Sequence, residues 1–180
     1  MGTLNSDNCL FLAIDIQEKL VKMLGETQVN KKAEILAKTA KILNIPTIVT
    51  EQYPKGLGAT IFEVISNLPQ AVYKEKTNFS VFYEEGFPVL IDSYKRNQIV
   101  LFGIETHICV LQTAFDLLDN EYEVFVVQDA SGSRNNTEHE AALKRILHYG
   151  AHIVTTEMVL FELLKGSNHP NFKEIQALIK

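Results

Sequence analysis

The 180-residue sequence lacks the features that mark disulfide-rich, membrane-spanning or nucleic-acid-binding proteins. Its only two cysteines, Cys9 and Cys109, lie far apart, so we expect no disulfide framework and a reducing cytoplasm as the default compartment. No apolar run approaches the ~20 residues that span a bilayer, and no signal peptide is recognised. The net charge of −5 argues against a nucleic-acid partner, which requires clustered Lys and Arg. These absences predict a soluble cytoplasmic protein.

Cofactor motifs are missing too, and we expect no cofactor. There is no phosphate-binding G-x-x-x-x-G-K-[ST] loop. The Gly56-Leu57-Gly58 segment lacks the third glycine of a dinucleotide fingerprint and does not join a strand directly to a helix. No Cys and His spacing suits structural zinc.

The chain does contain a regular alternation of apolar runs and helical patterns. A hydrophobic fraction of 46% and a charged fraction of 22% are typical of a globular protein, and the length suits a single domain over residues 1–180. Continuous apolar runs between helices indicate parallel strands that are covered on both faces. The sequence thus predicts an α/β/α three-layer sandwich around a mainly parallel six-stranded sheet. The expected strands are Cys9–Ile14, Thr47–Thr50, Ala71–Tyr73, Ile99–Ile104, Glu123–Val127 and His152–Val154.

Helical spacing of apolar residues predicts the elements between these strands. One helix carries Cys109 in its first turn, and another begins with a capping box formed by Thr137 and Glu140. His148 and Gly150 are expected at the end of that helix. A last helix is expected from about Pro170 to the C-terminus.

Polar residues follow the expected strands where ligands bind in sheets of this kind, outside the carboxyl ends of the strands. Asp15 follows the first strand, Glu51 the second and Lys76 the third. Residues 105–109 follow the fourth strand, and Asp129, which we interpret as structural, follows the fifth. These side chains are therefore candidates for a common site.

Cys109 is the candidate nucleophile. In the first turn of a helix, a thiol lies near the positive end of the helix dipole and near free N–H groups, which favours the thiolate. The alternative is that Cys109 simply packs in the core, as most free cysteines do. Cys9, at the start of a strand, is expected to be a core residue.

Asp15 and Lys76 are candidates for the base and the cation that a thiol nucleophile needs. A carboxylate that ends a buried strand is costly unless it is paired, and Lys76 follows another strand end. A structural Asp–Lys ion pair is the alternative. A Cys–His pair with His107 is disfavoured because residues two apart do not face each other on a helix.

Three segments together resemble the isochorismatase-like hydrolases, and the match extends over nearly the whole chain. They are Ala13-Ile14-Asp15-Ile16-Gln17, Lys76-Thr77-Asn78-Phe79-Ser80-Val81-Phe82 and Gly103-Ile104-Glu105-Thr106-His107-Ile108-Cys109-Val110. The stretch Thr50-Glu51-Gln52-Tyr53-Pro54-Lys55-Gly56-Leu57-Gly58 resembles the subgroup of isochorismatase domain-containing proteins.

This resemblance implies a catalytic triad of Asp15, Lys76 and Cys109. It also implies a cis peptide bond between Ile104 and Glu105, and an oxyanion hole formed by the backbone N–H groups of Glu105 and Cys109. The expected reaction passes through an acyl-thioester. Substrate-binding residues are expected among Gln17, Glu51, Tyr53, Phe79 and Phe82.

Two departures from better-known members narrow the expected reaction. Nicotinamidases of the family carry an Asp-x-His metal motif where this chain has Glu51-Gln52-Tyr53, and no histidine precedes His107. True isochorismatases typically lack the nucleophilic cysteine that Cys109 would supply. We therefore expect a metal-independent hydrolase that cleaves a small amide-, ureide- or ester-like molecule, most often at a carbon–nitrogen bond other than a peptide bond.

Other functions stay open at this stage. A binding or scaffold protein with vestigial chemistry would keep the same fold. A receiver-like module would want a second acidic residue beside Asp15 and a phospho-acceptor Asp where this chain has Lys74-Glu75-Lys76. The resemblance also implies a homo-oligomer, either a dimer or a tetramer.

Overall fold

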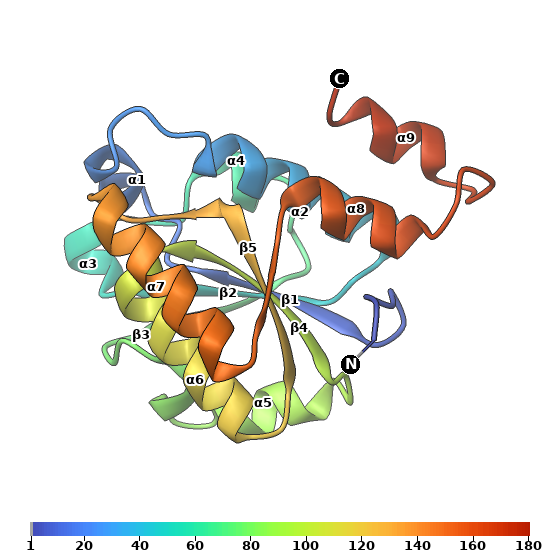
Figure 1. Ribbon diagram of the computed structural model, residues 1–180. Coiled ribbons are helices and arrows are strands. Elements are labelled where there is room, and N and C mark those ends of the chain that lie inside the picture. The colour runs from blue at the N-terminus through green and yellow to red at the C-terminus, as the bar shows by residue number, and fades with distance from the viewer. Residues whose placement is uncertain (1) are drawn as a thin grey trace.

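The computed structural model describes residues 2–180, which fold around one parallel six-stranded sheet (Figure 1). The strand order is β3-β2-β1-β4-β5-β6, and every neighbouring pair is parallel. This arrangement confirms the predicted three-layer α/β/α fold. The strands are β1 (Cys9–Ile14), β2 (Thr47–Gln52), β3 (Val72–Lys76), β4 (Gln98–Ile104), β5 (Glu123–Gly132) and β6 (His152–Val154).

Helices cover both faces of the sheet. On one side, α2 and α8 pack against it, and on the other lie α5, α6 and α7 (Figure 1). The helical segments are α1 (Glu18–Met23), α2 (Val29–Leu43), α3 (Pro54–Leu57), α4 (Phe62–Ile65), η1 (Val81–Tyr83), α5 (Phe87–Ser93), η2 (Thr106–Val110), α6 (Leu111–Asp119), α7 (Asn136–Tyr149), α8 (Thr156–Leu164) and α9 (Phe172–Ala177).

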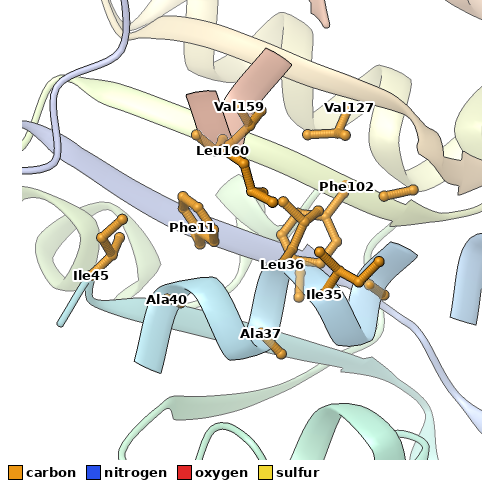
Figure 2. Packing of buried hydrophobic residues seen from close by; sticks show 14 of the residues in the cluster. Phe11, Ile35, Leu36, Ala37, Ala40, Ile45, Phe102, Val127, Val159 and Leu160 are labelled. Atoms are coloured by element: carbon orange, nitrogen blue, oxygen red, sulfur yellow. The ribbon is translucent and has the colours of Figure 1, made fainter. Parts of the chain in front are cut away.

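The alternation of side chains along each strand divides the core into two layers. In β1, Phe11 and Ala13 face α2 and α8, whereas Leu10 and Leu12 face the opposite layer. Figure 2 shows the first layer, where Phe11 and Phe102 of the sheet meet residues of α2 and α8. The rings of Phe11 and Phe102 pack edge to face at 6.2 Å. The central strands are buried on both faces, which explains why they appear in the sequence as unbroken apolar runs.

The structure changes several expected boundaries. Strand β3 extends to Lys76, so this lysine ends the strand instead of following it, and it is the one buried residue of β3. The segment before α6 is a π-helix, η2, which places Cys109 near its end and not in the first turn of an α-helix. Helices α1, α3, α4 and α8 were not predicted individually.

The expected capping box of α7 is wrong, although the end of that helix is confirmed. Asn135 caps α7, and its side chain accepts a hydrogen bond from the Thr137 N–H. His148 lies in the last turn, and Gly150 follows the helix with φ 120°. The last helix is shorter than expected and spans Phe172–Ala177. In residues 2–180, no helix combines the length and apolar character needed to cross a membrane.

Candidate active site

Asp15 lies just beyond the end of β1, in a fully buried position. Its backbone adopts a left-handed conformation with φ 51°, which turns the chain away from the sheet. Thr50 of the neighbouring strand β2 donates its hydroxyl to Oδ1 at 2.6 Å, and the same hydroxyl oxygen lies 3.2 Å from the Asp15 N–H. The pairing of Ile14 with Thr50 across β1 and β2 produces this contact. Asp15 is therefore fixed by the strand register.

Lys76 brings its ammonium group to the same edge of the sheet, and only 2% of the residue is exposed. Nζ lies 2.7 Å from Asp15 Oδ2, in an ion pair between two fully buried side chains. It also donates to Gln52 Oε1 at 2.6 Å and lies 3.1 Å from the carbonyl oxygens of Asn78 and Phe79. A buried charge is tolerated only when it is paired and hydrogen-bonded in this way.

Cys109 completes the cluster from η2, with its Sγ 3.5 Å from Lys76 Nζ. Burial, followed by the nearby Asp15 carboxylate, raises the pKa of Cys109 to about 12, and Lys76 opposes this rise. The sequence-based expectation of a lowered thiol pKa is therefore wrong for the free protein. Burial also raises the pKa of Asp15, while Lys76 and Thr50 oppose that rise. The site accordingly gathers a thiol, a carboxyl group and an amine in one buried cluster.

Gly103 allows β4 to approach β1 closely at this edge, a role that the sequence did not single out. It adopts φ 137° opposite Ile14. A Cβ atom at this position would lie 2.0 Å from the Ile14 carbonyl oxygen, so no other residue fits without moving the backbone. Asp15 follows Ile14 directly, and the segment that carries Cys109 follows Ile104. Gly103 thus sets the distance between the two chain segments of the site.

The turn between β4 and η2 is held by residues that follow β5. The peptide bond between Ile104 and Glu105 is cis. Glu105 is buried, and its carboxylate accepts hydrogen bonds from the Arg134 backbone N–H, Nε and Nη2 at 3.0–3.1 Å. Arg134 was part of the family resemblance, but its contact with Glu105 was not foreseen.

The two histidines near η2 also bond outside the cluster. Nδ1 of His107 lies 2.9 Å from Ser133 Oγ, which directs the ring to the loop after β5 and supports no Cys–His pair. Thr106 Oγ1 lies 2.9 Å from His139 Nδ1, where burial lowers the pKa of the imidazole. These contacts anchor η2 to Ser133 in the loop after β5 and to α7.

Gln17 and Glu51, both expected to bind substrate, form hydrogen bonds that hold the end of β2 and the loop that follows it. The Gln17 amide donates to the carbonyl oxygens of Gln52 and Gly58, and its oxygen accepts from the Gln52 N–H. Glu51 Oε1 accepts from both the N–H and the hydroxyl of Thr60 at 2.7 Å. These hydrogen bonds position residues 52–60, and contact of Gln17 and Glu51 with substrate stays a prediction.

The three aromatic candidates differ in exposure. Tyr53 and Phe79 are 58% and 54% exposed, and each adjoins a residue that contacts the Lys76 ammonium group. Phe82 is partly buried and packs edge to face against Phe87 at 6.0 Å. Tyr53 and Phe79 are therefore available for contact with a ligand, whereas Phe82 contributes to the core.

Asp129 lies within β5 and does not follow it as expected, and its hydrogen-bond partner is at the start of α8 and not in the turn after β5. Its Oδ1 accepts from the N–H and the hydroxyl of Thr156, at the start of α8, and its Oδ2 lies 3.4 Å from Lys32 Nζ. Within residues 2–180, no three His, Cys, Asp or Glu side chains are grouped so that they could hold a metal ion.

The open parallel sheet and the Asp–Lys–Cys cluster at its carboxyl edge define an α/β protein with the layout of a hydrolase. A family model described as "Isochorismatase domain" matches residues 9–158. The chain belongs to the isochorismatase family.

Relatives with similar sequences carry the same family name. Isochorismatase domain-containing protein 2 of Danio rerio is 40% identical over 180 residues, with 99% of this chain and 90% of that protein covered. Isochorismatase domain-containing protein 1 of the same fish is 39% identical over 183 residues and matches 100% of this chain. The chain spans only 64% of the length of that relative.

Solved structures of similar proteins share the whole fold. The MAR1 ribonuclease of Caenorhabditis elegans has a TM-score of 0.92 and 39% identity, and the match covers 99% of this chain and 92% of that one. The YcaC gene product of Escherichia coli, described as an octameric hydrolase of unknown specificity, has a TM-score of 0.87 and 25% identity. That match covers 97% of this chain and 95% of the other.

Proposed function

We propose that this protein is a metal-independent cysteine hydrolase that cleaves a small amide-, ureide- or ester-like molecule through Asp15, Lys76 and Cys109. We propose that the bond cleaved is a carbon–nitrogen bond other than a peptide bond. The observation that carries the proposal is the convergence of these three residues, which come from distant parts of the chain. Lys76 Nζ lies 2.7 Å from the Asp15 carboxylate and 3.5 Å from the Cys109 sulfur.

The first chemical step is attack of the Cys109 sulfur on the substrate carbonyl carbon. As the carbon–sulfur bond forms, the thiol proton passes to the Asp15 carboxylate, which acts as general base. The raised pKa of Asp15 suits this role, because a carboxylate of higher pKa accepts a proton more readily. The raised pKa of Cys109 requires such a base within the site, because few thiolates form spontaneously.

The second stage releases the two products. Protonated Asp15 gives its proton to the departing nitrogen or oxygen, and the carbon–heteroatom bond breaks to leave an acyl-thioester. Water then attacks the thioester with Asp15 again as base, which frees the acid and restores the thiol. Lys76 keeps its proton throughout and stabilises the negative charge that moves between Asp15 and Cys109.

Negative charge on the substrate oxygen also needs donors. We assign this role to the backbone N–H groups of Glu105 and Cys109, which belong to the same turn as the nucleophile. Backbone donors fixed in advance stabilise developing charge without reorganising during the reaction. The Arg134 contacts with Glu105 support the assignment, since they hold one of the two donor residues in place.

A catalytically vestigial binding or scaffold protein is the alternative function. The buried ion pair would then be a structural remnant, and Cys109 would have no turnover to support. The name of the Caenorhabditis elegans neighbour adds RNA to the substrates that a test must include. The net charge of −5 still favours a small molecule over a nucleic acid.

We further propose that the protein works in the cytoplasm as a homo-oligomer. The absence of a cysteine framework supports the reducing compartment. The Escherichia coli neighbour, described as octameric, supports assembly of identical subunits. Light scattering of the purified protein measures the number of subunits directly.

The deciding experiment compares wild type with Cys109→Ala against carboxamides, ureides, esters and an RNA oligonucleotide, each with and without EDTA. We expect hydrolysis of at least one small substrate by wild type, unchanged by EDTA and absent in the variant. No turnover by either protein on any small substrate would favour the scaffold. Activity lost with EDTA and restored by zinc would contradict metal independence.

A further inference from the structure

Gln52 is the last residue of β2 and lies directly opposite Lys76 in the register of β2 and β3. Each of its polar groups is bonded. Its side-chain oxygen accepts from Lys76 Nζ at 2.6 Å, and its amide nitrogen donates to the Thr77 carbonyl at 2.9 Å. Its backbone N–H and carbonyl are both held by the Gln17 side chain. Gln52 is therefore immobilised against the ammonium group.

The Lys76 ammonium has more acceptors than protons. Five atoms surround Nζ, whereas an ammonium group has three N–H donors. Two of the five, the Asp15 carboxylate and the Cys109 sulfur, belong to the proposed reaction. The other three are neutral oxygens, of Gln52, Asn78 and Phe79, and the Gln52 contact is the shortest of all five. The charge on Lys76 is thus shared between reacting and non-reacting partners.

The neutrality of Gln52 matters because the site is buried. A carboxylate at position 52 would compete with Asp15 for a single ammonium, and closely placed like charges raise each other's pKa. The other charged or titratable groups that face Lys76 are Asp15 from β1, Cys109 from η2 and the more distant Glu84 after η1. Glu51, the strand neighbour of Gln52, bonds to Thr60 instead.

We propose that Gln52 is a positioning residue that holds the Lys76 ammonium with a neutral acceptor and so keeps Asp15 as the only carboxylate available to take the Cys109 proton. This inference rests on the proposed function, because it assigns a role within that site. Its test reads the thiol directly and needs no substrate.

The test measures the rate at which iodoacetamide alkylates Cys109 between pH 7 and 10 in wild type, Gln52→Glu and Gln52→Met. Peptide mass mapping follows Cys109 and Cys9 separately in the same molecules. Gln70→Glu, at an exposed position before β3, is the matched control for the change in net charge. Labelling of Cys9, which is fully buried, reports any general loosening of the fold.

We expect Gln52→Glu to slow Cys109 alkylation at least about threefold across this pH range. An added neighbouring charge shifts a pKa by about 1–3 units, and the higher nucleophilicity of a more basic thiolate offsets roughly half of each unit. Local unfolding would speed labelling, so a slower rate cannot come from a damaged structure. Gln52→Met removes an acceptor without adding charge, so it should label Cys109 faster than wild type while Cys9 stays protected. Gln70→Glu should change neither rate.

Equal rates in wild type, Gln52→Glu and Gln52→Met would overturn the inference, and so would an equal slowing in both Gln52 variants. If Gln52→Glu does not fold, the Gln52→Met result decides, and an unchanged or slower Cys109 rate refutes the role of Gln52. Failure of the proposed function appears differently. In that case, wild type hydrolyses no small substrate, or complete alkylation of Cys109 leaves its turnover intact, whatever the Gln52 variants do.

Discussion

The two ends of the sheet each bury one cysteine, and they differ in what surrounds the sulfur. Cys9 begins β1 at the amino end, and Cys109 lies beyond β4 at the carboxyl end. Burial raises the pKa of both thiols to about 12. Cys109 has Asp15 and Lys76 as its charged neighbours, whereas the charged groups that act on Cys9 are Asp7 and Arg96. Arg96 donates to the backbone carbonyls of Ser6 and Cys9. If the proposed function holds, we expect reactivity to depend on a neighbouring base more than on the resting pKa of the thiol.

Cavity volume also fails to distinguish the carboxyl end of the sheet from the amino end as the candidate active site. A cavity of about 630 Å³ lies at the amino end, with Lys41, Tyr94 and Arg96 among the residues that line it. None of its lining residues is Asp, Glu, His or Cys. The carboxyl end instead gathers buried Asp15, Lys76 and Cys109. The buried cluster of a carboxyl group, an amine and a thiol, not volume, marks the candidate active site.

Replacing each cysteine in turn should give the largest contrast. Cys109→Ala is expected to lose turnover on any substrate that wild type hydrolyses, because no other residue in the cluster supplies a nucleophile. Cys9→Ala should retain wild-type kcat and KM, since Cys9 lies at the far end of β1. Steady-state kinetics of the two variants test this, with circular dichroism as the control for folding. Turnover retained by Cys109→Ala would contradict the proposed difference in role between Cys9 and Cys109.

Asp15→Asn should lower kcat by about 10²–10⁴, the range that general acid–base groups contribute. The amide cannot take the Cys109 proton but keeps an oxygen near Thr50 and Lys76. Single-turnover kinetics measure the effect on the chemical step. A kcat within twofold of wild type would show that another group accepts the proton.

Lys76→Met should destabilise the fold by about 3–5 kcal/mol, because it leaves the Asp15 carboxylate buried without a cation. Lys76 opposes the rise in the Asp15 pKa, so its loss raises that pKa further. A raised folded-state pKa stabilises the fold at low pH, and this contribution is lost as pH rises through that value. The variant should accordingly regain stability as pH falls from 8 to 5. Urea unfolding across this range, with Asp15→Asn/Lys76→Met as the matched control, measures both effects.

Glu84→Gln should have the smallest effect. Glu84 Oε1 accepts from the N–H groups of Thr77 and Asn78, which fixes the loop whose carbonyls contact Lys76. Burial would raise the pKa of Glu84, but these hydrogen bonds lower it overall. They therefore stabilise the fold at pH values above the pKa that Glu84 has in the unfolded chain. This stabilisation is lost as pH falls through the pKa of Glu84 in the folded protein. We expect a loss within about 1 kcal/mol at pH 7, because the amide oxygen still accepts. A larger loss of stability, measured by urea unfolding, would show that this loop contributes more to the fold than its contacts indicate.

Local patterns were sufficient to predict most of the fold. The apolar runs of β1, β4 and β5 are long enough to be recognised as buried strands, and the positions of Asp15, Lys76 and Cys109 follow from the strand ends. The pattern failed for β3, an edge strand whose exposed and buried residues alternate, so its extension to Lys76 was missed. It also failed for η2, because a π-helix has no distinct period in such a short segment.

The sequence by itself determined the succession of the six strands, several of the helices between them and the family, because these depend on hydrophobic periodicity and short motifs. Only the tertiary structure decided which polar side chains form hydrogen bonds within the protein. It placed Gln17 and Glu51 against the backbone of residues 52–60, and it brought Gln52 to Lys76 through the pairing of β2 with β3. It also reversed the expected shift of the Cys109 pKa, since burial and the Asp15 charge are sums over neighbours that are distant in sequence.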